Sequence, residues 1–175
     1  MYSFVAQAPG LPRRDSRLLS TFVQVYPMLK EGDKDPDIQL DSDSGEPFRL
    51  SSLKGVVLYF YPRADTPGCT VEACEFRDNS KKLAKKNMVI VGISPDAPKS
   101  QSKFKDKFSL PFTLLCDVDK TAAQTYGVYK EKNMYGKKVM GIERTTFPID
   151  EVGRIAKIFP KVKAQGHAEQ VLASL

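Results

Sequence analysis

Two cysteines five positions apart, Cys69 and Cys74, are the residues of this sequence best suited to do chemistry. They follow the segment 56–61, which is apolar at every position, as expected of a buried central strand. Pro62 ends that segment, and the spacing of apolar residues over 67–87 predicts an amphipathic helix. Cys69 therefore lies where a buried strand passes into a helix, a junction at which functional residues are common.

The start of the predicted helix favours a reactive state of Cys69. If Thr66 is the N-cap, Pro67 takes the first helical position, where its missing N–H costs nothing, and Cys69 takes the third. Unpaired N–H groups and the positive end of the helix dipole favour the thiolate, the nucleophilic form. We expect the Thr66 hydroxyl to lie near the sulfur or an oxygen bound to it, and Pro62 to shield the sulfur from bulk water. An ordinary half-buried cysteine on a capped helix remains the alternative.

The spacing of the two cysteines sets a condition on any bond between them. Five residues of helix rise about 7.5 Å, which places the two Cα atoms about 8 to 9 Å apart. A disulfide requires about 7 Å or less. A disulfide between Cys69 and Cys74 would therefore require the first turns of the helix to unwind, so that oxidation is coupled to local unfolding.

The remaining cysteine and the one histidine exclude other kinds of site. The pair is not a Cys-x-x-Cys motif, and Cys116 and His167 lack the spacing of zinc ligands. A cysteine protease would need a base beside Cys69, whereas we expect His167 to lie at the surface or to cap a helix. Cys116 follows a predicted strand and is expected to be a small apolar filler, with a regulatory thiol as the alternative.

The run from Pro62 through Thr66 to Cys69 resembles the Pro-x-x-x-Thr-x-x-Cys motif of peroxiredoxins. Cys74 falls where the peroxiredoxin Q, or bacterioferritin comigratory protein, subfamily carries its resolving cysteine. The likeness covers residues 28–175 and continues through the segments 130–136, 141–147, 161–163 and 166–169. It implies a thioredoxin-like fold and a thiol peroxidase that needs no metal or organic cofactor.

The resemblance also implies a role for each residue of the motif. Cys69 would reduce hydrogen peroxide or an organic hydroperoxide and become a sulfenic acid, and Cys74 would condense with it to a disulfide. Thioredoxin or a similar dithiol would reduce that disulfide. Arg144 sits at the position of the active-site arginine, where its charge would hold the thiolate and polarise the peroxide. Without the resemblance, Arg144 would be taken for a surface arginine at the start of a strand.

The order of elements predicts an α/β fold with a central mixed sheet flanked by helices and an N-terminal β-hairpin. The hairpin is expected around a turn within residues 38–50. Further strands and helices are expected at 89–93, 99–108, 112–115, 145–149 and from 167, with 154–159 forming a second hairpin. Pro148 stands where the family commonly has leucine, and because proline removes a ladder donor, its strand should be an edge strand or carry a bulge.

Composition bounds the class of protein. The chain has 175 residues, 41% of them hydrophobic, and a net charge of +6, which suits one globular domain. No run of about 18 apolar residues occurs, so we expect no membrane span. Three cysteines favour a reducing compartment, the cytoplasm. The chain carries no recognised nucleic-acid motif, and a solvated helix face accounts for the lysine cluster of Lys81, Lys82, Lys85 and Lys86.

The last expectations concern the N-terminal segment, the bounds of the domain and the oligomeric state. Residues 1–27 hold three arginines and one acid, a weak likeness to a transit peptide, and we favour an extension or disordered tail over organellar targeting. The domain itself is expected over 28–175, as a monomer or weak homodimer. A peroxide sensor or thiol relay that uses the same cysteine pair is the rival function.

Overall fold

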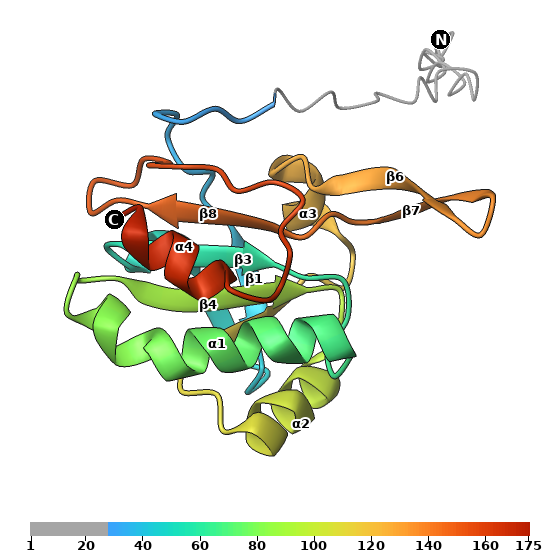
Figure 1. The fold of residues 1–175 in the computed structure, drawn as a ribbon, viewed down its shortest axis with the longest axis horizontal. Helices are drawn as coiled ribbons and strands as arrows, with labels where there is room; N and C mark the ends of the chain where they lie inside the picture. Colours follow the sequence, from blue (N-terminus) through green and yellow to red (C-terminus); the bar gives the residue numbers. More distant parts are fainter. Residues whose placement is uncertain (1–27) are drawn as a thin grey trace, which may run out of the picture.

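The computed structural model describes residues 28–175, and Figure 1 shows their fold. The extension expected at residues 1–27 lies outside this range. The elements begin with β1 (Gln39–Ser42), β2 (Pro47–Arg49), a 3₁₀ turn (Leu50–Ser52), β3 (Val56–Phe60), α1 (Pro67–Ala84), β4 (Val89–Ser94) and α2 (Pro98–Phe108). They continue with β5 (Thr113–Cys116), α3 (Thr121–Thr125), β6 (Tyr129–Met134), β7 (Lys137–Ile142), β8 (Thr145–Ile149) and α4 (His167–Ala173).

Six strands form one mixed sheet in the order β2-β1-β5-β4-β3-β8. The strands β3, β4 and β5 run parallel, whereas β1 and β8 run antiparallel to their neighbours. The N-terminal hairpin of β1 and β2 is present with register Leu40 opposite Phe48. The predicted α/β class and mixed sheet are thus confirmed, and the shared elements differ from their expected bounds only near their ends.

The central strand β3 is buried at every position because helices cover both faces of the sheet. Its alternate side chains enter two separate cores. Val57 and Tyr59 pack with α1, α2 and α4 on one face, whereas Leu58 and Phe60 pack with α3 on the other. This packing fixes the end of β3, and with it the start of α1, in a rigid framework.

Strand β8 closes one edge of the sheet, which confirms the expectation for Pro148. The expected partner strand over 154–159 is present only as two isolated bridges, Ile149 with Ile155 and Thr146 with Phe159. The two bridges enclose three residues on the 155–159 segment but only two on β8. The extra residue on the 155–159 segment is a bulge. Pro148 lies within this interval and has no N–H to donate, although its carbonyl accepts from the Ala156 N–H at 2.8 Å.

The two-stranded ribbon formed by β6 and β7 and the short helix α3 were not predicted from the sequence. The ribbon projects from the body of the molecule on the side where β3 ends and α1 begins (Figure 1). Most of its side chains are exposed, so it lacks the buried alternation that identifies a strand in a sequence. The lysine cluster on and after α1 is exposed, as expected of a solvated face. Among residues 28–175, no helix has the length and apolarity needed to cross a membrane.

Candidate active site

Helix α1 begins as its sequence predicts. Thr66 is the N-cap with extended backbone, Pro67 opens the helix, and Cys69 lies at the third helical position. The Thr66 hydroxyl donates to the Arg63 carbonyl at 2.9 Å and makes no capping bond to the helix. The N–H groups of the first turn therefore keep their partial positive charge on the side where Cys69 lies.

Arg144 contacts the Cys69 sulfur, although the two residues lie 75 positions apart. One guanidinium nitrogen, Nη2, donates to Cys69 Sγ at 3.3 Å. The other, Nη1, forms an ion pair with Glu72 Oε2. Only 1% of Cys69 is exposed, so this charge acts on the sulfur in a region from which water is largely excluded.

Glu72 is the site residue that the sequence analysis missed. It lies one helical turn after Cys69, with 0% of its surface exposed, and it anchors the guanidinium of Arg144. Burial raises the pKa of Glu72 to about 7, although the Arg144 charge acts in the opposite direction. Its second oxygen, Oε1, has no hydrogen-bond partner. The sequence did carry one signal that could have identified Glu72. Its carboxyl group falls on the same helix face as the apolar residues Ala73 and Phe76, which are buried.

Arg144 remains charged in this setting. Burial by itself lowers the pKa of Arg144, but the neighbouring Glu72 and Cys69 outweigh burial and raise it above its ordinary value. Its backbone is also fixed, because the Val162 N–H donates to the Arg144 carbonyl at 2.9 Å. The guanidinium of Arg144 is therefore both fixed in position and permanently charged, so it can hold an anion at a defined distance.

A polar network holds the loop that leads from β3 to Cys69. The Tyr61 hydroxyl donates to Gln101 Oε1, and Gln101 Nε2 donates to Ser94 Oγ at 2.8 Å. Ser94 Oγ in turn donates to Asp96 Oδ2 at 2.6 Å, and the same oxygen accepts from the Ala64 N–H at 2.8 Å. The loop is thereby tied to β4 and α2, which limits how far the start of α1 can shift.

The structure places the other residues of the motif around this arrangement. Pro62 is exposed, whereas Tyr61, Ala64 and Phe76 share the buried cluster that contains Cys69. That cluster covers the sulfur from inside the molecule, and shielding by Pro62 on the solvent side stays a prediction. Cys74 is half-buried and lies within the same unbroken helix as Cys69, and both are free thiols.

His167 neither lies at the surface nor caps a helix, because it is buried and follows the N-cap residue Gly166 as the first residue of α4; both parts of that expectation were wrong. The residue is 0% exposed, and its ring packs edge-on between Phe76 and Phe159. Its Nε2 lies 2.7 Å from Thr146 Oγ1, and burial lowers the pKa of the imidazole. Gly166 adopts φ 79° immediately before α4, a conformation that favours glycine and turns the first helical residue inward.

Cys116 is buried, in agreement with a filler role. Burial raises the pKa of its thiol to about 12, with Asp43 adding to the effect. The thiol donates to the Ser42 carbonyl at 3.7 Å. Cys116 is therefore a protonated, unreactive sulfur at neutral pH.

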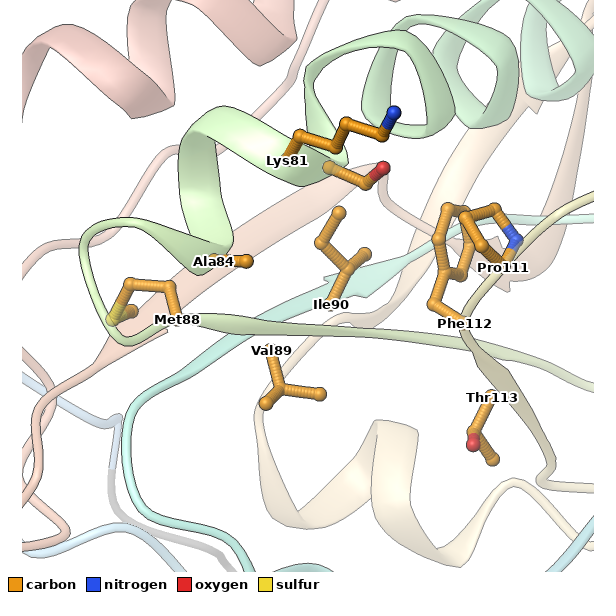
Figure 2. A pocket seen from close by; sticks show the side chains of 9 residues that line it. Lys81, Ala84, Met88, Val89, Ile90, Pro111, Phe112 and Thr113 are labelled. Carbon is orange, nitrogen blue, oxygen red and sulfur yellow. The ribbon is translucent and has the colours of Figure 1, made fainter.

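A hollow of about 340 Å³ lies away from Cys69, between the C-terminal half of α1 and the start of β4 and β5 (Figure 2). Its lining is mainly apolar, with Ile90 and Phe112 at its floor and Lys81 at its rim. Neither Cys69 nor Arg144, which bonds its sulfur, is among the residues that line it. Among residues 28–175, no group of three or more His, Cys, Asp or Glu side chains is arranged to hold a metal ion.

Comparison with known proteins gives a consistent result. Residues 32–158 match the AhpC/TSA family. A putative peroxiredoxin bcp of Coxiella burnetii is 52% identical over 149 residues, which cover 84% of this chain and 99% of that protein. Peroxiredoxin Bcp of Bacillus subtilis is 48% identical over 149 residues, or 84% of this chain and 95% of that protein.

Solved structures agree with the sequence relatives. The bacterioferritin comigratory protein of Xanthomonas campestris, described in connection with its alkyl peroxide reduction activity, superposes with a TM-score of 0.75 at 38% identity. The match covers 78% of this chain and 88% of that one. The fold of the described residues is thus the thioredoxin-like fold that the sequence predicted.

Proposed function

Because this chain belongs to the AhpC/TSA family and is a peroxiredoxin, a thiol-dependent peroxidase, we propose that Cys69 is its peroxidatic cysteine and Cys74 its resolving cysteine. The observation that carries the assignment is the bond from Arg144 Nη2 to Cys69 Sγ at the start of α1. Of the three cysteines, Cys69 alone among the described residues combines a helix N-terminus with a guanidinium on its sulfur.

In the first step the Cys69 thiolate attacks the terminal oxygen of the hydroperoxide. A sulfur–oxygen bond forms as the oxygen–oxygen bond breaks, so that the sulfur is oxidised to a sulfenic acid and the peroxide is reduced. The departing oxygen leaves as hydroxide or alkoxide and takes up a proton to become water or an alcohol. Arg144 stabilises the negative charge that moves from sulfur to that oxygen, and the Thr66 oxygen is available to accept a bond from the peroxide.

In the second step Cys74 attacks the sulfenic acid, forms the disulfide and releases water. The two residues lie on one continuous helix, so the first turns of α1 must unwind before their sulfurs meet. Both cysteines belong to the same chain, so the cycle needs no second subunit, and we expect a monomer or weak homodimer. Thioredoxin or a similar dithiol of a reducing cytoplasm then reduces the exposed disulfide, which returns both thiols.

The substrate class follows from the setting of the sulfur. Cys69 belongs to a buried, mainly apolar cluster that includes Phe76, and such surroundings suit the carbon chain of an organic hydroperoxide as well as hydrogen peroxide. The Xanthomonas relative, with its alkyl peroxide reduction activity, supports the same class. We therefore propose that the enzyme reduces both kinds of peroxide.

A coupled assay tests the two cysteine roles. The reduced protein is mixed with hydrogen peroxide or an alkyl hydroperoxide, thioredoxin, thioredoxin reductase and NADPH, and the loss of NADPH is followed. Cys69→Ser should abolish turnover, whereas Cys74→Ser should reduce one peroxide per chain and then stop or slow sharply. Cys116→Ser is the matched control and should turn over like the wild type, because its buried thiol stays protonated.

The outcomes separate the competing assignments. Turnover by Cys69→Ser would show that another residue is the nucleophile. If the wild type consumes peroxide once and forms the Cys69–Cys74 disulfide, but thioredoxin does not restore it, the chain acts as a peroxide sensor or relay with another partner.

A further inference from the structure

Two lysines of the exposed ribbon reach back to the segment that carries Arg144. Lys130 and Lys132 lie two residues apart on β6 and hence on the same face of the strand. Lys130 Nζ pairs with Glu143 Oε1 at 3.0 Å, and Lys132 Nζ donates to the Ile142 carbonyl. The two lysines thus bond the two residues that immediately precede Arg144, Ile142 at the end of β7 and Glu143 directly after it.

The side chain of Lys132 passes close to Gly141 of β7. A Cβ atom at Gly141 would lie 3.5 Å from Lys132 Cδ, an ordinary contact distance, so the aliphatic stem of the lysine lies against β7 at that point. Lys132 is half-buried, whereas Asn133, Met134 and Tyr135 after it are exposed. Its ammonium group is therefore directed inward, toward the base of the ribbon, and away from bulk solvent.

The charges around this ammonium include those of the active site. Burial lowers the pKa of Lys132, and the Arg144 guanidinium lowers it further, while Glu143 and Cys69 raise it. The coupling between two charged groups is mutual, so a thiolate that favours the ammonium is favoured by it in return. The bond to the Ile142 carbonyl fixes where that ammonium stands.

We propose that Lys132 is a second cation of the active site, a positioning residue that holds the Arg144 segment through the Ile142 carbonyl and adds its charge to the field at the Cys69 sulfur. This inference rests on the proposed role of Cys69 as the nucleophile. Arg144 touches the sulfur and Lys132 acts from a greater distance, so the two cations together stabilise the thiolate and the oxygen anion that follows it.

The pH dependence of Cys69 alkylation isolates the charge of Lys132. In a Cys74→Ser background, the reduced protein is treated with iodoacetamide across a pH series, and modification of Cys69 is followed by mass spectrometry. Lys132→Met should move the midpoint upward by about one pH unit. At pH values below the midpoint, where the fraction of thiolate limits the rate, it should also slow the reaction of Cys69 with hydrogen peroxide by about 10-fold. Lys132→Gln, which keeps a donor for the Ile142 carbonyl but has no charge, should move the midpoint equally.

Two further variants are the controls. Lys132→Arg should restore a midpoint close to that of the wild type. Lys138→Met removes a lysine of β7 whose side chain is 79% exposed and pairs with Glu131, and it should change neither readout.

A midpoint that stays in place in both Lys132→Met and Lys132→Gln would overturn the inference, even if the peroxide reaction slows, because the lysine would then act only on the ribbon. Failure of the proposed function looks different. In that case the Cys74→Ser protein with Lys132 intact would consume no peroxide, whatever its alkylation midpoint.

Discussion

Arg144 joins the two buried groups of the site, the Cys69 thiol and the Glu72 carboxyl. It bonds the Cys69 sulfur through Nη2 and Glu72 through Nη1, both out of contact with bulk water. The pair with Glu72 fixes the plane of the guanidinium, so that its second nitrogen points at the sulfur. The position of this one side chain therefore decides how well the thiolate is stabilised.

Gly68 tests that dependence, since it lies directly against the guanidinium. A Cβ atom at this position would stand 3.2 Å from Arg144 Nη2, closer than ordinary contact allows. Gly68→Ala should push the guanidinium away from Cys69 and lower kcat/KM for hydrogen peroxide by about 10-fold. The melting temperature should hold or rise, because alanine favours a helix more than glycine does.

Steady-state kinetics and thermal unfolding of the reduced Gly68→Ala protein measure the two effects. Unchanged kcat/KM would mean that the Arg144 guanidinium can move away from the added methyl group and still stabilise the Cys69 thiolate. A melting temperature that falls along with activity would attribute the loss to the fold of α1.

The sequence predicted the residues that belong to a local pattern. Thr66, Pro67 and Cys69 could be placed relative to one another because a helix N-terminus fixes its first three positions. Glu72 and Lys132 could not be placed, because their partners lie in segments distant along the chain or across a ribbon that was not foreseen. His167 was misjudged because its inward direction depends on packing between Phe76 and Phe159.

At the scale of elements, the sequence predicted the strands and helices that bury at least one face in the core. The apolar run of β3 and the helical spacing of α1 express burial directly in the sequence. The ribbon of β6 and β7 is mostly exposed, and its strands are stabilised by pairing with each other and by lysine contacts at its base. Such contacts leave no periodic pattern in a sequence.

Helix α1 must change shape if its two cysteines are to bond. The helix holds 18 residues, and unwinding its first two turns removes roughly seven of them. Addition of one equivalent of hydrogen peroxide to the reduced protein should therefore lower the helical circular dichroism at 222 nm, and a dithiol should restore it. The Cys74→Ser protein, which forms no disulfide, should keep its spectrum. An oxidised protein shown by mass spectrometry to contain the disulfide, yet with an unchanged spectrum, would contradict the unwinding.

At the scale of the whole molecule, buried acids make stability depend on pH. Burial raises the pKa of Glu72 to about 7 and that of Asp35 to about 6. The unfolded chain ionises both near pH 4 to 4.5, whereas the folded chain keeps their protons until higher pH, so each acid weakens the fold as the pH rises through this interval. His167 acts in the opposite direction, because its pKa is lowered and acid favours the unfolded chain, which takes up the proton.

Comparison with Glu72→Gln isolates one of these groups, since the other two occur in both proteins. The free energy of unfolding of the wild type, relative to that of Glu72→Gln, should fall by on the order of 3 kcal/mol between pH 4.5 and pH 7. Urea unfolding of the reduced proteins across this range measures the difference. A difference that does not vary with pH would show that folding leaves the pKa of Glu72 unchanged.

The two edge strands of the sheet determine whether copies of the protein can associate while the start of α1 is unwound. One edge is β2, which has only three residues and starts at Pro47, and the other is β8, which is covered irregularly by residues 154–159 around Pro148. An open edge strand is a template to which another copy can add, and short strands, prolines and bulges prevent such addition. In the proposed cycle the first turns of α1 unwind repeatedly and uncover apolar side chains such as Ala73. Because both edges are blocked in this way, we expect that these openings do not seed fibrils when the enzyme is oxidised repeatedly at high concentration.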